Sequence, residues 1–380
     1  MDLIQPTSPE WDRWLGYTAH DVFHTAAYHA FSQEHGGGEA FLAVYGRPEK
    51  FIAFPYLLRR VADCEGLHDA PGHDVASVYG YPGPVVCGVR PDDAFVHAAW
   101  NALVDLWRQQ GVVSVFTRFH PLLENHRWLD GISAVVPSSG LAVEAYEARN
   151  GGLVSSGQTV TIDLTIPEGE IVRNYQKVLR QEIASGRRQG LRTEEDPVRK
   201  DLDAFTALYH LTMSRNHAAP DYFFPNGYFR ELCRALDPYV HVMVTRQGED
   251  IAAAGLFIEY RGFVHAHLAG TSERFRALSP LKILLDDVRQ WGGTRGNRFF
   301  HLGGGRGGRE DSLLAFKRRF SRRHDPFMTG RWIIDHGAYR ALCDRRLESV
   351  GRAGREFETL DFFPLYRAPL KPNTCGVATP

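Results

Sequence analysis

Residues 299–320 read FFHLGGGRGGREDSLLAFKRRF. The apolar start of this stretch predicts a short strand, and the acidic pair before Ser312 predicts the N-terminus of a helix that carries Lys317. Between strand and helix lie five glycines, which permit positive φ and let a ligand approach backbone N–H groups closely. The start of the helix adds a favourable partial charge for an anion. The stretch therefore predicts a strand, a glycine-rich turn and a helix of an α/β protein, with an anion site at the turn.

The spacing of these glycines excludes two common nucleotide motifs. No Gly-Lys-Ser/Thr follows them, as a Walker A loop requires, and the stretch lies late in the chain without the βαβ unit of a dinucleotide fingerprint. A nucleotide-hydrolysing enzyme is therefore excluded. A tight strand-to-helix connection without a ligand remains the second interpretation of the turn.

A second notable segment is a basic helix. The apolar spacing of residues 168–189 predicts one continuous helix with a buried stripe. At 100° per residue, five cations fall within about 60° of a common direction opposite that stripe: Arg173, Lys177, Arg180, Arg187 and Arg188. This basic face is suited to a phosphate backbone, although an ordinary solvated helix face explains it as well.

The remaining second half predicts helices at 201–215 and about 226–236, then three antiparallel strands. A further helix begins at Ser279-Pro280, with Ser279 as its N-cap, and ends at Gly292-Gly293. It leads into the strand of the opening stretch. Helices, a three-stranded meander, then helix and strand is the element order of the GNAT acyltransferase fold, an order that identifies no activity by itself.

The first half also alternates sheet and helix. Strands are expected at 39–45 and 51–58, a helix at 94–109 and a strand from Val112. The Gly- and Ser-rich segment 150–157 then predicts a domain boundary. We expect two tandem α/β (α+β) domains, 1–158 and 159–380, each with a mixed, mainly antiparallel sheet flanked by helices.

Charge differs between the halves although the formal net charge is −1. Residues 1–150 hold 10 Lys and Arg against 18 Asp and Glu, whereas the remainder holds 34 against 27. The basic second half points weakly to phosphate. The five cysteines have no metal-ligand spacing and their number is odd, so we expect neither a metal site nor a disulfide framework. No signal peptide and no eighteen-residue apolar run is visible, which predicts a cytoplasmic protein.

The opening stretch also carries a family resemblance. LGGGRGGREDSLLAFKRRFS resembles the late Gly-rich, acidic and Phe-Lys motif of the Fem family, also described as FemAB/FemX peptidyltransferases. YQKVLRQEIASGRRQGL and LYHLTMSRNHAAPDYF are similar to two further family segments, and within 1–150 only YGYPGPVV is similar. The resemblance implies two GNAT-like domains in tandem. It also implies transfer of an aminoacyl group from tRNA to the amine of a peptidoglycan precursor or a small natural product, without a further cofactor.

Matched to the family's motif, Phe316 and Lys317 are the implied catalytic pair, with the lysine near the donor carbonyl and a substrate phosphate. Arg215 is the implied phosphate-binding arginine, by a looser match. We expect four more substrate contacts: Gly303, Gly304, Gly305 and His267. Arg318 and Arg319 extend the expected tRNA surface of the basic face. His267 and His265, two apart on one strand, lack a third metal ligand, so packing or hydrogen bonding is the simpler role for them.

Two other functions stay open. Where a typical GNAT protein has a glycine loop for the coenzyme A pyrophosphate, this chain has FRALSPLKILL, which makes a weaker phosphate grip. An acyl-CoA-dependent N-acyltransferase is therefore the alternative enzyme. A tRNA- or nucleotide-binding module without catalysis is the alternative of another class, and the presence of Lys317 beside the glycines argues against it.

Overall fold

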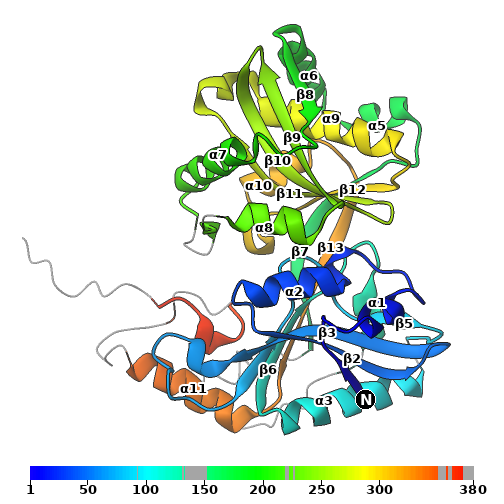
Figure 1. The fold of residues 1–380 in the computed structure, drawn as a ribbon, viewed down its shortest axis with the longest axis vertical. Helices are drawn as coiled ribbons and strands as arrows, with labels where there is room; N and C mark the ends of the chain where they lie inside the picture. Colours follow the sequence, from blue (N-terminus) through cyan, green and yellow to red (C-terminus); the bar gives the residue numbers. More distant parts are fainter. Residues whose placement is uncertain are drawn as a thin grey trace, which may run out of the picture. The chain divides into compact units, whose positions relative to one another are not determined.

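The computed structural model describes residues 1–91, 93–130, 132, 152–218, 222–225, 227–349, 357 and 362–370. It divides into two compact units (Figure 1). Unit 1 comprises residues 1–155 and 328–380, and unit 2 comprises residues 156–327. Cys375 and residues 219–221 of the LYHLTMSRNHAAPDYF segment lie outside the described residues.

Unit 1 is built on a mostly antiparallel sheet of order β1-β2-β3-β4-β6-β13, in which only the pair β4 and β6 is parallel. Its strands are β1 (Asp2–Ile4), β2 (Glu39–Arg47), β3 (Lys50–Arg60), β4 (His73–Ala76), β5 (Val85–Cys87), β6 (Val112–Arg118) and the end of β13 (His324–Ile333). The helices that accompany them are α1 (Glu10–Leu15), α2 (Ala26–Glu34), α3 (Ala94–Gln109) and α11 (His336–Glu348). Strand β5 pairs with β3.

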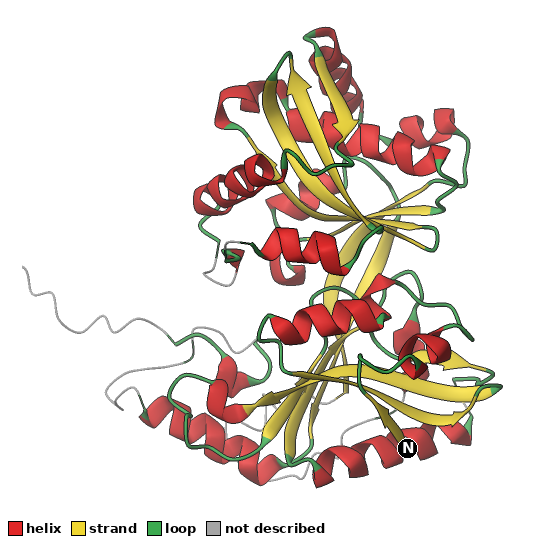
Figure 2. Ribbon diagram, in the orientation of Figure 1, coloured by secondary structure: helices red, strands yellow, loops and turns green. Residues whose placement is uncertain are grey.

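Unit 2 has a sheet of order β7-β12-β11-β10-β9-β8, antiparallel except between β11 and β12. Its strands are β7 (Gly152–Asp163), β8 (Leu191–Glu195), β9 (Val240–Gln247), β10 (Asp250–Tyr260), β11 (Phe263–Thr271) and β12 (Phe299–Gly304). Its helices are α5 (Glu168–Asn174), α6 (Lys177–Arg188), α7 (Leu202–Arg215), α8 (Tyr228–Ala235), α9 (Pro280–Thr294) and α10 (Ser312–Lys317). Helices and sheet alternate in both units (Figure 2), which is the expected α/β class.

An apolar core holds helices α6, α9 and α10 on the sheet of unit 2. Leu179 and Ile183 of α6 pack with Leu284 of α9, Leu314 of α10 and Phe300 of β12, all at most 4% exposed. Burying side chains of this size contributes about 1.5–3 kcal/mol each, so the core can fix the neighbouring loops. The expected meander is confirmed as β9, β10 and β11. None of the described helices is long and apolar enough to cross a membrane.

The expected domain boundary differs from the observed division at the C-terminal end. Residues 159–380 were expected as one domain, but residues 328–380 belong to unit 1. The reason is pairing and packing: β13 pairs with β6 antiparallel, and Tyr339 of α11 is buried in an apolar cluster of unit 1. Strands β7 and β13 therefore carry the chain from one unit into the other and back.

Two local expectations about helices are wrong. Residues 168–189 form two helices rather than one, because Tyr175 (φ −67°, ψ 142°) and Gln176 (φ −59°, ψ 143°) are extended. Ser279 precedes α9 in the left-handed conformation and makes no side-chain cap. Its hydroxyl instead accepts a hydrogen bond from Lys282 Nζ. Helix α9 also continues past Gly292 and Gly293 to Thr294.

Candidate functional site

The break between α5 and α6 is held by hydrogen bonds from outside the helical ladder. One guanidinium nitrogen of Arg180 donates to the carbonyl oxygens of Val172 (3.3 Å), Arg173 (3.3 Å) and Tyr175 (2.8 Å). The N–H of Gln176 donates to the carbonyl of Arg319, 2.9 Å away. These bonds satisfy groups that a continuous helix would have paired internally, so the break costs little.

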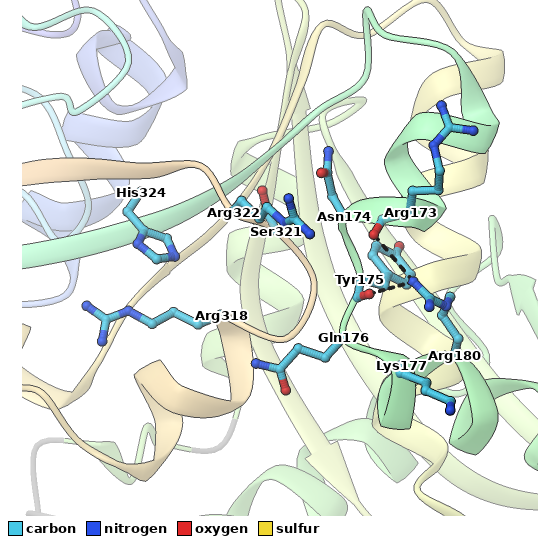
Figure 3. A pocket seen from close by; sticks show the side chains of 10 residues that line it. All are labelled: Arg173, Asn174, Tyr175, Gln176, Lys177, Arg180, Arg318, Ser321, Arg322 and His324. Carbon is cyan, nitrogen blue, oxygen red and sulfur yellow. Dashed lines mark hydrogen bonds between the residues drawn. The ribbon is translucent and has the colours of Figure 1, made fainter.

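A cavity of about 540 Å³ opens at this break (Figure 3). We call it the basic cavity, and two segments of unit 2 line it. The first runs from the end of α5 through the break into α6 and supplies Arg173, Asn174, Tyr175, Gln176, Lys177 and Arg180; the second runs from the end of α10 to the start of β13 and supplies Arg318, Ser321, Arg322 and His324. Five of these side chains carry a positive charge at neutral pH. None of the described residues that line the cavity is acidic.

The charges of the basic cavity are unevenly compensated. Arg318 is paired: its two terminal nitrogens contact Glu310 at 2.5 and 2.6 Å, and a third contact reaches Gln158 Oε1 at 2.8 Å. Arg173, Lys177 and Arg322 form no ion pair with another described residue. The N-terminus of α6, twelve residues long, begins at the same place. Uncompensated cations beside a helix N-terminus favour binding of an anion.

The glycine turn, residues 303–308, is held by the cap of α10. Asp311 is the N-cap residue: Oδ1 accepts from Leu314 N at 2.9 Å, and Oδ2 accepts from Arg306 N at 3.2 Å. A Cβ on Gly305 would lie 2.0 Å from the carbonyl oxygen of Arg309 and 2.6 Å from Asp311 Oδ1. Glycine is therefore required there by close packing, which is the structural interpretation of that position.

Lys317 closes the glycine turn from the end of α10. Its Nζ donates to the carbonyl oxygen of Gly304 at 2.6 Å. Burial lowers the pKa of Lys317 to about 8, and the negative charge of Asp311 acts in the opposite direction. An ammonium has three N–H donors and only one is used by Gly304, so two remain for a substrate oxygen. Desolvation also strengthens any charge–charge contact that the ammonium makes.

Phe316, the expected partner of Lys317, packs inward. Its ring lies 5.6 Å from that of Phe320 at 70°, and it contacts the core of unit 2. This orientation fits a residue that fixes α10 while the lysine faces the turn.

Other predicted residues lie outside the basic cavity. Arg187 pairs with Asp286 at 2.7 Å and with Asp287, Arg188 is exposed, and Arg319 contacts Glu182 at 3.4 Å. Arg187 and Arg188 lie at the C-terminal end of α6, about two turns from Lys177 and Arg180, and the carboxylates of α9 hold Arg187 away from the cavity.

Arg215 and His267 are also apart from the cavity lining. Arg215, at the end of α7, pairs with Glu273 at 2.8 Å. His267 lies on β11, and burial lowers its pKa to about 4, so it is neutral at physiological pH. Its strand neighbour His265 lies beside His301 of β12, with 3.4 Å between the two Nδ1 atoms.

Six lining residues were not predicted as site residues: Asn174, Tyr175, Gln176, Ser321, Arg322 and His324. Arg322 belongs to the run of five cations from Lys317 to Arg323, and the sequence does not indicate which of them share a direction. Asn174 and Gln176 flank the break, and nothing in the helical periodicity marks them. The direction of the chain after Phe320 decides which of these side chains face the cavity, and the sequence does not give that direction.

Comparisons with known proteins agree with this architecture. Residues 173–318 match the family model of the acetyltransferase (GNAT) domain. Comparison of the sequence with characterised proteins gives no match. The matched range includes most of the basic cavity and the whole glycine turn.

Among solved structures, the crystal structure of FemX superposes with a TM-score of 0.66 at 12% identity, over 90% of this chain and 99% of that chain. The structure of L-PGS from Bacillus licheniformis gives 0.51 at 11% identity, over 92% and 98% of the two chains. The C-terminal domain of a putative lysylphosphatidylglycerol synthetase from Agrobacterium fabrum gives 0.50 at 16% identity, over 89% and 96%. The chain therefore has a GNAT-type acyltransferase fold and resembles FemX over 90% of its length.

Proposed function

We propose that this protein transfers an aminoacyl group from tRNA to an amine and so forms an amide bond. The observation that carries the proposal is the basic cavity, where two segments of unit 2 gather five cations without an acidic lining residue. Arg318 lines this cavity, and the residue that precedes it in the sequence, Lys317, contacts the glycine turn. An aminoacyl-tRNA carries many phosphates and a reactive ester at its end. The phosphates fit the cations of the basic cavity, and the ester carbonyl fits the ammonium of Lys317.

In the proposed reaction the acceptor amine attacks the ester carbonyl carbon of the aminoacyl group. The carbonyl oxygen becomes an oxyanion, the bond to the ribose oxygen breaks, and the amine proton leaves with that oxygen. Lys317 stabilises the oxyanion with its free N–H donors, a contribution worth about 3–4 kcal/mol for a preorganised donor. The ester is already activated, so no strong protein base is required when the amine arrives neutral.

Binding of the donor is assigned to phosphate contacts. Arg173, Lys177 and Arg322 have no ion pair with a described residue, so phosphates meet no competing carboxylate there. The expected roles of Arg180, Arg187, Arg188, Arg318 and Arg319 in tRNA binding, and of Arg215 and His267 at the substrate, remain proposals. We propose a cytoplasmic enzyme that needs no cofactor besides its donor, with a peptidoglycan precursor or a natural-product amine as acceptor.

A second candidate is acyl transfer from coenzyme A, favoured by the match of residues 173–318 to the acetyltransferase (GNAT) domain. Against it stands the start of α9, where Pro280 supplies no N–H and Ser279 replaces a glycine of the usual pyrophosphate loop. This start offers a coenzyme pyrophosphate fewer backbone donors.

The deciding experiment is a single-turnover assay with two donor sets. A mixture of charged tRNAs and a panel of acyl-CoA esters are each combined with candidate amines, and amide products are identified by mass spectrometry. Product from tRNA alone is expected. Product from acyl-CoA alone would move the donor assignment to coenzyme A, and tight tRNA binding without product would indicate a binding module.

A further inference from the structure

Tyr175 joins the two walls of the basic cavity. Its backbone lies in the break between α5 and α6, and Tyr175 itself lines the cavity. Its ring packs edge-on against Phe320, with 5.4 Å between centroids and 74° between planes. The backbone bond from Gln176 to Arg319 lies beside this contact. Two residue pairs therefore connect the segment 173–177 with the segment 318–324: Tyr175 with Phe320, and Gln176 with Arg319.

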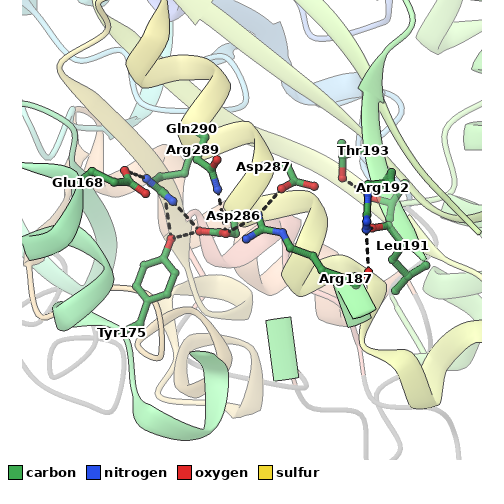
Figure 4. Close-up of polar contacts among 11 residues, drawn as sticks. Glu168, Tyr175, Arg187, Leu191, Arg192, Thr193, Asp286, Asp287, Arg289 and Gln290 are labelled. Atoms are coloured by element: carbon green, nitrogen blue, oxygen red, sulfur yellow. Dashed lines mark hydrogen bonds and ion pairs between the residues drawn. The ribbon is translucent and has the colours of Figure 1, made fainter. Parts of the chain in front are cut away.

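Two side chains of α9 form hydrogen bonds with the hydroxyl of Tyr175 (Figure 4). It donates to Asp286 Oδ1 at 2.8 Å and accepts from Arg289 Nε at 3.1 Å. Arg289 also contacts Asp286 Oδ1 at 2.9 Å and pairs with Glu168 of α5. Tyr175, Asp286 and Arg289 are each at most 3% exposed. We call these three residues the Tyr175 network.

The network also decides which cations are available to a ligand. Asp286 Oδ2 accepts from Arg187 at 2.7 Å and from Gln290 at 3.2 Å, so this carboxylate is used at both oxygens. Arg187 and Arg289 are thereby held by carboxylates of unit 2, whereas Arg173 and Lys177 on either side of Tyr175 are not. Burial and the neighbouring Asp286 raise the pKa of Tyr175, so its hydroxyl remains a donor at physiological pH.

We infer that Tyr175 is a positioning residue: anchored by Asp286 and Arg289, it keeps the break between α5 and α6 in place and thereby sets the spacing of the cations in the basic cavity for a phosphate-bearing ligand. The inference rests on the proposed function for its physiological ligand. Without the hydroxyl anchor, residues 168–188 regain the option of a continuous helix, which their apolar periodicity favours. Arg173 and Lys177 would then turn away from Arg322.

Tyr175→Phe tests the inference, because it removes the hydroxyl and keeps the ring that packs on Phe320. Binding is measured against salt with two probes: a short single-stranded RNA ending in CCA, and inorganic tripolyphosphate. We expect RNA affinity to fall roughly 5- to 10-fold and the log–log salt slope to become shallower by about 1.4, the value for two lost phosphate contacts on a single strand. Asp286→Asn should weaken binding in the same direction.

The matched control is Tyr366→Phe in unit 1. Tyr366 is also fully buried, and its hydroxyl lies 3.2 Å from Asp74 Oδ2 and 2.8 Å from Ser114 Oγ, so it loses the same kind of bond. Thermal unfolding should show similar losses of Tm for the two Phe variants, while only Tyr175→Phe changes the salt slope.

The two probes separate failure of the inference from failure of the proposed function. A Tyr175→Phe protein with wild-type affinity and slope for both probes would overturn the inference. Tripolyphosphate binding that depends on Tyr175, together with no RNA binding by the wild type, would support the inference and reject the tRNA donor. Binding of neither probe by the wild type would overturn both, since the basic cavity would then hold no phosphate.

Discussion

Unit 2 uses positive charge in two contrasting places. The basic cavity collects five cations in an open space of about 540 Å³, and four of them have no ion pair with a described residue, although Arg180 donates to backbone carbonyls. The glycine turn instead holds a single ammonium, that of Lys317, against one carbonyl oxygen. Several solvated cations together give an affinity for phosphates that depends on the salt concentration. A dehydrated charge interacts more strongly with a charge that develops beside it.

On the proposed function, the basic cavity binds the donor and Lys317 acts in the chemical step. Burial lowers the pKa of Lys317 to about 8, a value near the pH at which an acyltransferase works, whereas the guanidinium groups of the basic cavity stay charged at any such pH. The two places should therefore respond differently to substitution, salt and pH.

The largest effect is expected for Lys317→Met. Methionine keeps most of the packing of the side chain and removes the charge, so the single-turnover rate should fall by roughly 10²–10³ if the ammonium meets the oxyanion. The affinity for RNA should remain within about twofold of wild type, because the basic cavity is intact. Rate and affinity are measured by single-turnover transfer and by fluorescence titration.

Arg318→Met and Arg319→Met serve as neighbouring controls for Lys317→Met. Each removes a cation that is already paired, with Glu310 and Glu182 respectively, so the rate should drop much less. Near-normal transfer by the Lys317→Met protein would assign this residue to the turn's structure alone.

The opposite response is expected when three cations without an ion pair are removed from the basic cavity. Replacing Arg173, Lys177 and Arg322 together by Gln should lower RNA affinity by about 10- to 100-fold at moderate salt and make the log–log slope shallower by about 2, because three phosphate contacts are lost. The rate at saturating RNA should change little. Unchanged affinity and slope would show that these cations are merely solvated.

The pH dependence of transfer should identify Lys317 as well. With hydroxylamine, an acceptor that is neutral throughout the range, the wild-type rate should fall about tenfold per unit well above pH 8, because the ammonium is lost. Lys317→Arg keeps its charge and should show no such fall, whatever its absolute rate. A wild-type rate that stays level up to pH 9.5, after subtraction of the uncatalysed reaction, would contradict the role.

The free energy of unfolding should respond to the titration of Lys317 in the opposite direction to the transfer rate. The pKa of Lys317 is lower in the folded chain than its ordinary value, so the folded chain binds this proton less tightly than the unfolded chain does. The ammonium therefore opposes folding below pH 8, and this cost disappears as the pH rises toward the ordinary lysine value.

Much of the fold could be predicted from local signals. Helix α3 begins and ends where expected, at Ala94 and Gln109, because Asp93 caps its start by accepting from Phe95 N and Gly111 follows its end. The meander β9 to β11 follows from apolar runs joined by short turns. The return of residues 328–380 to unit 1 could not be predicted, since strand pairing between β13 and β6 is a contact between distant segments.

The candidate site shows the same limit of local reasoning. The glycine turn and Lys317 are continuous in sequence, so their contact followed from one stretch. The basic cavity depends on the break at Tyr175, which is stabilised against the helical periodicity by a hydrogen bond donated by Arg180 and by two that Asp286 and the Arg319 carbonyl accept. Periodicity predicts one face for Arg173, Lys177, Arg180, Arg187 and Arg188, and tertiary hydrogen bonds divide them.

The smallest effect is expected from that division, in a comparison of Arg187→Met with Arg188→Met. Arg187 pairs with Asp286 and Asp287, so its loss should lower the free energy of unfolding by about 1–2 kcal/mol and leave the salt slope for RNA unchanged. Arg188 is exposed and forms no ion pair with another described residue. Its loss should change stability by less than about 0.5 kcal/mol, and the slope by about 0.7 only if it touches a phosphate. Denaturant unfolding and RNA titration of the two proteins side by side measure both quantities. A shallower slope for Arg187→Met at unchanged stability would return this arginine to the RNA surface that its helical spacing predicts.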